Sequence, residues 1–210
     1  MKSNRKIALF GGTFDPIHLG HTKVAKAAVK EIGAQALIHI PAKRSALKTK
    51  PQASDRDRLN MIELAIKDLE HFHVSDCELK RSAPSFTLET VRELKKRFGR
   101  NPDIYWLLGA DTVRELPRWF GILDLIDECN LTCMYRAGFD PPDFSQYEAL
   151  FGRQRAEKLE KNIIKTPLVD ISSTEVRQRC ADGKDISGLV HPDVAEYIQE
   201  HSIYQKRNKR

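Results

Sequence analysis

The sequence predicts an α/β protein with a doubly wound, mostly parallel sheet and helices on both of its faces. Short apolar runs of strand length alternate with longer amphipathic runs of helix length along the 210 residues. Several of the apolar runs are followed directly by polar or glycine-rich residues, which is where parallel sheets bind their ligands. No repeat or low-complexity segment interrupts this alternation. Such an order is typical of a parallel sheet with helical crossovers.

The first half of the chain alternates strand and helix. Expected strands are rich in apolar and β-branched residues, and expected helices carry apolar residues three and four positions apart. The expected strands are Lys6–Phe10, Ala36–Ile40 and Phe72–Ser75. The expected helices that follow them are His18–Ile32, Asp55–Leu69 and Thr87–Phe98. Pro41 ends the second strand, residues 42–54 are a polar loop, and Ser85 is the expected N-cap of the last helix.

The second half continues the pattern less regularly. Its expected strands are Asp103–Leu108, which ends at Gly109, Asn130–Tyr135 and Leu168–Ile171. Its expected helices are one or two short ones within Glu148–Glu160, followed by Ser173–Ala181 and Pro192–His201. Pro141 and Pro142 mark a loop. No linker composition divides the chain, so we expect one domain over residues 1–205 and a basic tail over 206–210.

Composition favours a folded, soluble protein. Hydrophobic residues make up 40% of the chain and charged residues 30%, and no apolar run approaches the ~20 residues of a membrane span. The basic N-terminus is not followed by a signal-peptide apolar region, so we expect a cytoplasmic location. None of the four cysteines forms a C-x-x-C pair, and we therefore expect reduced thiols and no metal held by the protein.

The net charge of +6 is concentrated at the C-terminus. Four positive charges come from Lys206, Arg207, Lys209 and Arg210, so the rest of the chain is close to neutral. This distribution argues against a broad nucleic-acid-binding face. A solvated, frayed end is the favoured interpretation of the tail, and a nucleic-acid-binding arm is the alternative.

The segment Gly11–His21, with the sequence GGTFDPIHLGH, follows the first strand and opens the first helix. Unpaired N–H groups and the helix dipole make such a junction a phosphate site. The two leading glycines allow close approach of the backbone, and Thr13 offers a hydroxyl. His18 and His21 are three residues apart on one helical face and can donate to phosphate and add positive charge. The alternative is a glycine-rich turn whose histidines only cap and pack.

A second segment places three hydroxyls, those of Ser172, Ser173 and Thr174, at the start of a helix, with Arg177 one turn later. Either serine could be an ordinary N-cap, and Glu175 could complete a capping box. The helix dipole disfavours a cation at this end, and a bound polyphosphate would explain Arg177 better.

With these two segments the chain resembles the H-x-G-H nucleotidyltransferases, whose opening G-[GS]-[TS]-F-D-P-x-H-x-G-H and late I-S-S-T-x-[IV]-R it carries in full. Further similarity is to the bacterial nicotinate-nucleotide adenylyltransferase branch. It rests on Pro84–Thr90, on Gly109-Ala110-Asp111 followed by Leu116 and Trp119, and on Val194–Ile198. The resemblance covers about residues 6 to 204 and implies a Rossmann-like fold.

The resemblance implies condensation of ATP, accompanied by Mg²⁺, with nicotinate mononucleotide to give nicotinate adenine dinucleotide and pyrophosphate. Mg²⁺ would be held mainly by substrate and water. The implied catalytic residues are His18, His21, Lys48 and Arg177. The implied ATP-binding residues are Gly11, Gly12, Thr13, Phe14, Gly109, Ile171, Ser172, Ser173 and Thr174. The implied mononucleotide-binding residues are Asp15, Lys43, Arg44, Thr87, Asp111, Trp119 and Arg136.

Several of these residues have a structural alternative. Trp119 could be a core aromatic, Arg136 a surface arginine, and Gly109–Asp111 a simple turn after a strand. Trp106, inside an apolar strand, is expected in the core, and His39 receives no role.

The chain departs from the family pattern P-N-x-x-P-P-H-[KR] after the second strand. Leu47 stands where the family has a histidine that helps to hold the mononucleotide phosphate, although Lys48 is present. We expect Lys43, Arg44 or Lys48 to share that role.

Two other functions remain open at this point. A phosphopantetheine adenylyltransferase would share both phosphate segments but is usually shorter and lacks the Thr87 and Trp119 segments. A non-catalytic nucleotide-binding protein is disfavoured by the intact His18, His21 and Arg177. A homo-oligomer is possible, and no membrane partner is expected.

Overall fold

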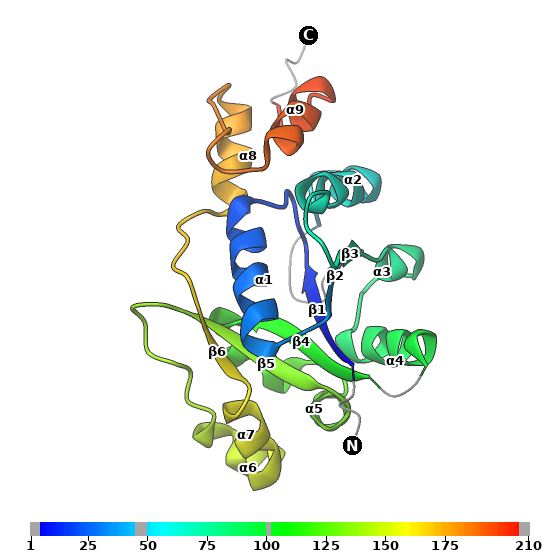
Figure 1. The fold of residues 1–210 in the computed structure, drawn as a ribbon, viewed down its shortest axis with the longest axis vertical. Helices are drawn as coiled ribbons and strands as arrows, with labels where there is room; N and C mark the ends of the chain where they lie inside the picture. The colour runs from blue at the N-terminus through cyan, green and yellow to red at the C-terminus, as the bar shows by residue number, and fades with distance from the viewer. Residues whose placement is uncertain (1–4, 45–49, 100–101, 206–210) are drawn as a thin grey trace.

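The computed structural model describes residues 5–44, 50–99 and 102–205. In these residues six strands form one sheet in the order β3-β2-β1-β4-β5-β6, and all neighbouring strands are parallel (Figure 1). The strands are β1 (Lys6–Gly12), β2 (Ala36–Pro41), β3 (Phe72–Val74), β4 (Asp103–Gly109), β5 (Asn130–Arg136) and β6 (Ile163–Thr166). The order reverses between β1 and β4, which confirms the predicted doubly wound, Rossmann-like fold.

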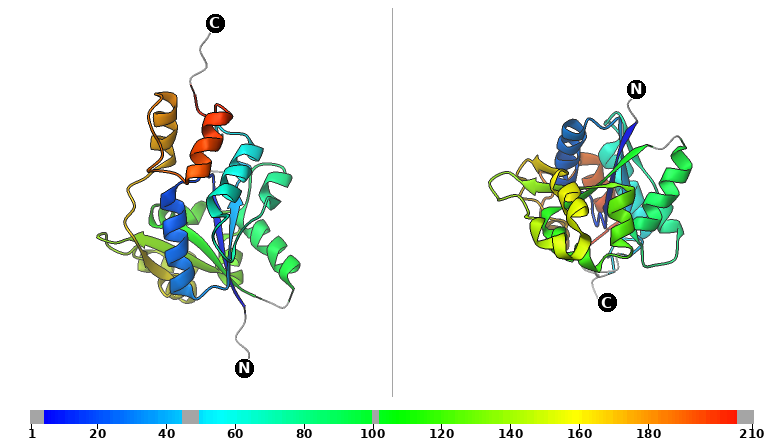
Figure 2. Two further views of the ribbon diagram at one scale, coloured as in Figure 1. Left: turned by 45° about the horizontal axis from the view of Figure 1, so that its top comes forward. Right: turned by 90° about the horizontal axis from the view of Figure 1, so that it is seen from below.

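Helices connect the strands. They are α1 (Leu19–Ile32), α2 (Asp55–Ile66), α3 (Cys77–Lys80), α4 (Thr87–Phe98), α5 (Ile122–Glu128), α6 (Glu148–Phe151), α7 (Arg153–Glu160), α8 (Ser173–Ala181) and α9 (Pro192–Glu200). Two 3₁₀ helices, η1 (Ala110–Arg118) and η2 (Ser145–Tyr147), precede α5 and α6. Helices α8 and α9 lie beyond one end of the sheet, opposite the end where the chain begins (Figures 1 and 2).

Burial of both sheet faces explains why β1 is a continuous apolar run. Ile7 and Leu9 pack into a core that includes residues of α4, α5 and α7. Ala8 and Phe10 point to the other face and pack into a core formed with α1, α2 and α9. Alternate residues of the strand therefore serve opposite layers, as expected for a parallel strand covered on both sides.

The last strand lies earlier than predicted. Residues Leu168–Ile171 are not a strand, and β6 is formed by Ile163–Thr166, which pairs with β5. Pro167 follows and has no N–H to continue the ladder. Leu168 is 57% exposed, so its apolar character does not reflect burial.

Smaller differences concern helix boundaries. The helix that begins at Asp55 ends at Ile66 instead of Leu69, and the two helices within Glu148–Glu160 are α6 and α7. Ser85 is not the N-cap of α4; Phe86 takes that position, and the Ser85 hydroxyl accepts the Lys43 N–H at 3.2 Å. The short elements α3, η1 and α5 were not predicted, because none has a sustained apolar period.

In the described residues no helix is long and apolar enough to cross a membrane. Cys77, Cys129 and Cys133 are buried as free thiols, and burial raises the pKa of Cys129 and Cys133 to about 12. The basic tail 206–210 lies outside the described residues.

Candidate active site

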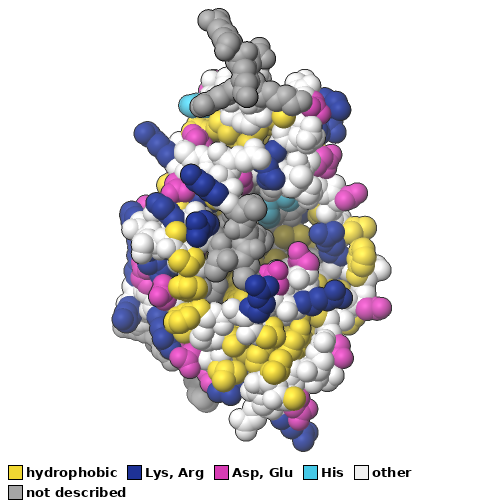
Figure 3. All heavy atoms as spheres, turned by 180° about the vertical axis from the view of Figure 1, so that it is seen from behind, with side chains coloured by type: hydrophobic (Ala, Val, Ile, Leu, Met, Phe, Trp, Pro, Cys, Tyr) yellow, Lys and Arg dark blue, Asp and Glu magenta, His cyan; other side chains and the backbone are white. Residues whose placement is uncertain are grey.

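A cleft of about 1390 Å³ opens at the carboxyl ends of the strands, beside the switch point between β1 and β4. Its wall includes residues of β1, the start of α1, η1, the end of β5 and the start of α8. Histidine lies at the floor of a hollow on this side of the molecule, and Lys and Arg side chains border it (Figure 3). Sites for single small ligands are about 300–1,000 Å³, so this cleft has room for two substrates.

Nearly all the predicted site residues line this one cleft. Those on its wall are Gly11, Gly12, Thr13, Phe14, Asp15, His18, His21, Thr87, Gly109, Asp111, Trp119, Arg136, Ile171, Ser172, Ser173, Thr174 and Arg177. Lys43 and Arg44 are not on the wall, and Lys48 and Leu47 lie outside the described residues. Segments separated by more than 150 residues in the sequence therefore meet at one place.

The two histidines of the opening segment form a stacked pair at the start of α1. Their ring centroids are 3.7 Å apart, and the planes are inclined by 28°. His18 is the N-cap residue, and its backbone N–H donates to Nδ1 of His21 at 3.2 Å. Nδ1 of His21 is therefore an acceptor, which places the proton of the neutral ring on Nε2. The predicted shared face is present: His18 is the N-cap of α1, and His21 lies within its first turn.

His18 is a buried imidazole that is neutral at pH 7. The residue is 8% exposed, and burial lowers the pKa of its imidazole to about 4. The positive charge that we expected from His18 near neutral pH is therefore absent before an anion binds. Among the residues that the structure describes, none forms a hydrogen bond with its buried Nδ1. A Cβ atom on Gly20 would lie 2.8 Å from that nitrogen, so Gly20 is what allows the ring to pack on the backbone.

The opening loop between β1 and α1 is held by side chains from distant segments. The carbonyl of Thr13 accepts from the guanidinium of Arg58 at 2.7 Å. The carbonyl of Asp15 accepts from the guanidinium of Arg177 at 2.7 Å. The carbonyl of Pro16 accepts from the hydroxyl of Ser173 at 2.9 Å. These bonds satisfy carbonyl groups that no sheet or helix ladder reaches, and they fix the loop before substrate arrives.

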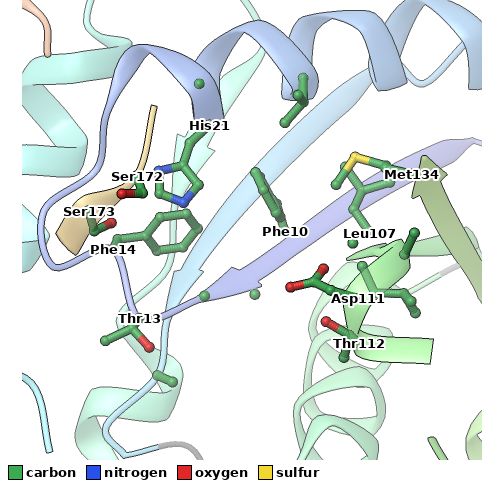
Figure 4. Close-up of a pocket in the computed structure, with 18 of the residues that line it drawn as sticks. Phe10, Thr13, Phe14, His21, Leu107, Asp111, Thr112, Met134, Ser172 and Ser173 are labelled. Carbon is green, nitrogen blue, oxygen red and sulfur yellow. The ribbon is translucent and has the colours of Figure 1, made fainter. Parts of the chain in front are cut away.

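The start of α8 combines capping with a cation. Ser172 is the N-cap and accepts the N–H of Glu175 at 3.1 Å, so the capping interpretation of this serine is confirmed. The second arm of Arg177 donates to the Thr174 hydroxyl at 3.2 Å. Ser172, Ser173, Phe14 and the His21 ring gather on one side of the pocket (Figure 4). A polyphosphate at this position would meet a helix N-terminus, hydroxyl groups and a guanidinium.

The carboxylate of Asp15 is already occupied by the protein. It is 5% exposed and accepts the backbone N–H groups of Gln52 at 2.8 Å and Ala53 at 3.0 Å, together with the Tyr204 hydroxyl at 2.7 Å. Although Asp15 lines the cleft, its side chain is engaged in holding neighbouring segments. Its assignment to the mononucleotide stays a prediction.

The other side of the cleft carries aromatic and charged groups. Asp111 and Thr112 lie across β1 from His21 (Figure 4). Trp119 packs against the core and also lines the cleft, and its role in binding the mononucleotide stays a prediction. Thr87 is the first residue of α4, next to Phe86, whose ring is 4.8 Å from that of Phe120.

The Lys43 side chain contacts residues that do not line the cleft. Its ammonium group is 3.0 Å from a carboxylate oxygen of Asp55 and donates to the carbonyl of Leu79 at 3.0 Å. Arg44 is exposed. The hypothesis that either residue replaces the histidine missing at Leu47 stays a prediction, and the geometry does not favour it.

Sequence reasoning missed several residues of the cleft and its support. Arg58 is fully buried and is ion-paired with Asp55 at 2.8 Å. It occupies an apolar-stripe position of α2, three and four residues before buried Met61 and Ile62, and that was a detectable signal. Tyr204 and the cleft residues Lys50, Glu78, Arg114 and Arg118 have no comparable local signal. Trp106, expected in the core, is buried there and also borders the cleft against Gly11.

Comparison with known proteins agrees with this geometry. The family described as cytidylyltransferase-like matches residues 9–179. Relatives named "Probable nicotinate-nucleotide adenylyltransferase" include one from Dehalococcoides mccartyi, 38% identical over 204 residues, which cover 96% of this chain and 98% of the relative. Another, from Neisseria meningitidis, is 36% identical over 96% of this chain and 100% of its own length. Among solved structures, the nicotinic acid mononucleotide adenylyltransferase of Plasmodium falciparum complexed with NaAD superposes with a TM-score of 0.74. It is 20% identical over 95% of this chain and 97% of its own.

Proposed function

Because the chain belongs to the cytidylyltransferase-like family and, within it, to the nicotinate-nucleotide adenylyltransferases, we propose that it transfers the adenylyl group of ATP to nicotinate mononucleotide. The products are nicotinate adenine dinucleotide, a precursor in NAD biosynthesis, and pyrophosphate. The similarity to these relatives extends over 96% of the chain, so the proposal rests on nearly all of its 210 residues.

The observation that carries the proposal is the junction of the two phosphate segments. Arg177 donates to the carbonyl of Asp15 at 2.7 Å, and Ser173 donates to that of Pro16, so the start of α8 lies against the opening loop. A triphosphate bound there would lie between the histidine pair and the guanidinium. Such a two-sided arrangement suits a chain of phosphates better than a single one.

The chemistry requires little beyond positioning and charge stabilisation. A phosphate oxygen of the mononucleotide attacks the α-phosphorus of ATP, and the bond from that phosphorus to the bridging oxygen breaks. Pyrophosphate leaves with the electron pair. The nucleophile is already an anion, so no protein base has to remove a proton. His18 and His21 would donate to the α- and β-phosphates, while Arg177 and the hydroxyls at the start of α8 would hold the leaving group.

ATP would enter as its magnesium complex. In the part of the chain that the structure describes, no group of three acidic, cysteine or histidine side chains is arranged to hold a metal. The proposed ATP site lies at the starts of α1 and α8. Its donors are N–H groups, hydroxyls and a guanidinium, which suit phosphate oxygens and not a cation. Mg²⁺ would then be bound by phosphate oxygens and water.

The mononucleotide would occupy the other side of the cleft. Trp119 is a stacking surface for the pyridine ring, and Thr87 at the start of α4 offers donors for the ring carboxylate. Arg136 would approach the mononucleotide phosphate, and Asp111 the sugar hydroxyls. A cytoplasmic location and a homo-oligomeric assembly stay predictions.

Pyrophosphate release from MgATP tests the proposal when it is measured with three co-substrates. We expect release with nicotinate mononucleotide and slower release with nicotinamide mononucleotide. Release with phosphopantetheine alone would assign the protein to the other adenylyltransferase branch. No release with any of the three would refute the enzymatic function.

A further inference from the structure

Asp15, in the opening loop, is joined to the far end of the chain by one side-chain hydrogen bond. The hydroxyl of Tyr204 donates to Oδ1 of Asp15 at 2.7 Å, across 189 residues of sequence. Burial, together with the neighbouring Asp15 carboxylate, raises the pKa of Tyr204, so the hydroxyl keeps its proton and remains a donor. The contact joins a neutral donor to a charged acceptor, which makes it stronger than a bond between neutral groups.

The backbone before Tyr204 is shaped to make this contact. Ser202 and Tyr204 have φ values of 51° and 64°, a left-handed conformation that non-glycine residues rarely adopt. The turn that follows α9 is closed by the N–H of Ile203, which donates to the carbonyl of Ile198 at 3.0 Å. Residues persist in this conformation when the surrounding contacts determine it, and such residues cluster near functional sites. The turn brings the Tyr204 ring back from α9 to the opening loop.

The same Asp15 also binds Arg177, the cation of the proposed ATP site. Its carbonyl oxygen accepts from Nη1 of Arg177, while its carboxylate accepts from Tyr204 and from the backbone of Gln52 and Ala53. Within the described residues, the other hydrogen-bond acceptor of Arg177 is the hydroxyl of Thr174. The placement of the guanidinium therefore depends on the placement of the Asp15 peptide.

We propose that Tyr204 is a positioning residue for ATP: its hydrogen bond to Asp15 fixes the Asp15 carbonyl and thereby orients the Arg177 guanidinium toward the triphosphate. The inference rests on the proposed function, because it assumes that ATP binds beside Arg177. The hydroxyl itself does not touch substrate. Loss of the hydroxyl leaves two backbone donors on the carboxylate, so the loop keeps its fold while the aspartate gains freedom to shift.

Tyr204→Phe tests this inference, with Tyr197→Phe as the matched control. Tyr197 makes a similar contact from the same C-terminal region, donating to Oδ1 of Asp57 at 3.0 Å, but Asp57, unlike Asp15, does not line the cleft. MgATP affinity is measured by calorimetry without the mononucleotide. We expect Tyr204→Phe to weaken binding about tenfold and Tyr197→Phe to change it less than twofold; tenfold is about 1.4 kcal/mol.

A double-mutant cycle with Arg177→Ala separates positioning from a general effect on the fold. If Tyr204 acts through Arg177, Tyr204→Phe weakens MgATP binding less than twofold once the guanidinium is gone. All variants are compared at a temperature where circular dichroism shows each of them folded. Unchanged affinity in Tyr204→Phe, with or without a lower melting temperature, would overturn the inference. An undiminished effect in the Arg177→Ala background would also overturn it.

The same protein preparations also test the proposed function, independently of the inference about Tyr204. Wild-type protein that binds MgATP but releases no pyrophosphate with any co-substrate would refute the enzymatic function. The binding cycle between Tyr204 and Arg177 would still decide the inference, because it needs no turnover.

Discussion

Gly20→Ala should lower activity without lowering stability. The added Cβ atom would lie 2.8 Å from Nδ1 and 2.9 Å from Cε1 of the His18 ring, where ordinary contacts begin at about 3.4 Å. The ring must therefore move by roughly 0.6 Å, since the helix backbone is the stiffer partner. A 1 Å misplacement of a catalytic group can cost about 100-fold in rate, so a shift of this size should cost about tenfold in kcat/KM.

The free energy of unfolding of Gly20→Ala should rise or stay the same, although its activity falls. Alanine is favoured over glycine within helices by up to about 1 kcal/mol, and Gly20 belongs to the first turn of α1. Gly188→Ala is the matched control, because a Cβ atom there would meet nothing within 4 Å and the residue is not on the cleft wall. Pyrophosphate release and thermal melting are measured for both variants. A Gly20→Ala protein with kcat/KM within twofold of wild type would refute the argument that His18 must keep its place.

The remaining predictions concern three side chains. His21→Ala should lower turnover about 10²–10³-fold, measured as pyrophosphate release, because losing one transition-state contact costs about 3–4 kcal/mol. Its melting temperature should stay within a few degrees of wild type. Exposed His73 on β3 provides the alanine control. A His21→Ala protein that melts at a much lower temperature, but turns over normally where it is folded, would show that His21 is structural. Trp119→Ala should raise the KM for nicotinate mononucleotide about tenfold while Trp119→Phe retains most of the affinity; equal KM values would leave Trp119 as a core residue. Burial lowers the pKa of His39 to about 4, so its stabilising neutral form is fully present above pH 6.5 and is lost as the pH falls toward 4. Between pH 7 and pH 5 this residue alone should cost about 2 kcal/mol in urea unfolding, and His39→Phe should remove that part of the pH dependence; the same loss in both proteins would contradict it.

The fold was predictable where the burial of a segment follows from its own residues. Both faces of β1 are covered, so a continuous apolar run identified the strand. Leu168–Ile171 misled the prediction because Leu168 is apolar yet exposed, whereas the real strand, Ile163–Thr166, includes a lysine. Burial at the edge of a sheet is decided by its neighbours, and local composition does not contain that information.

The candidate site was predictable to the extent that its chemistry lies within short segments. Gly11–His21 and Ser172–Arg177 each carry their donors in consecutive residues, and both line the cleft. The side chains that hold these segments could not be found in the same way. Arg58 reaches Thr13 across 45 residues, and Tyr204 reaches Asp15 across 189. Such contacts depend on how α2 and the C-terminal turn pack, which only the folded chain determines.

The neutral state of His18 changes how the histidine pair would contribute to catalysis. An imidazolium would attract the phosphates of ATP in the ground state and in the transition state alike, and only the difference between them accelerates the reaction. A buried imidazole with a pKa of about 4 offers an N–H donor without that constant attraction. As negative charge develops on the departing pyrophosphate, the same donor would gain strength in surroundings of low dielectric constant. Burial of His18 lowers the stability of the fold in acid, and it would also direct the histidine contact to the transition state. Arg177, held by Asp15 and Thr174, would provide the permanent positive charge.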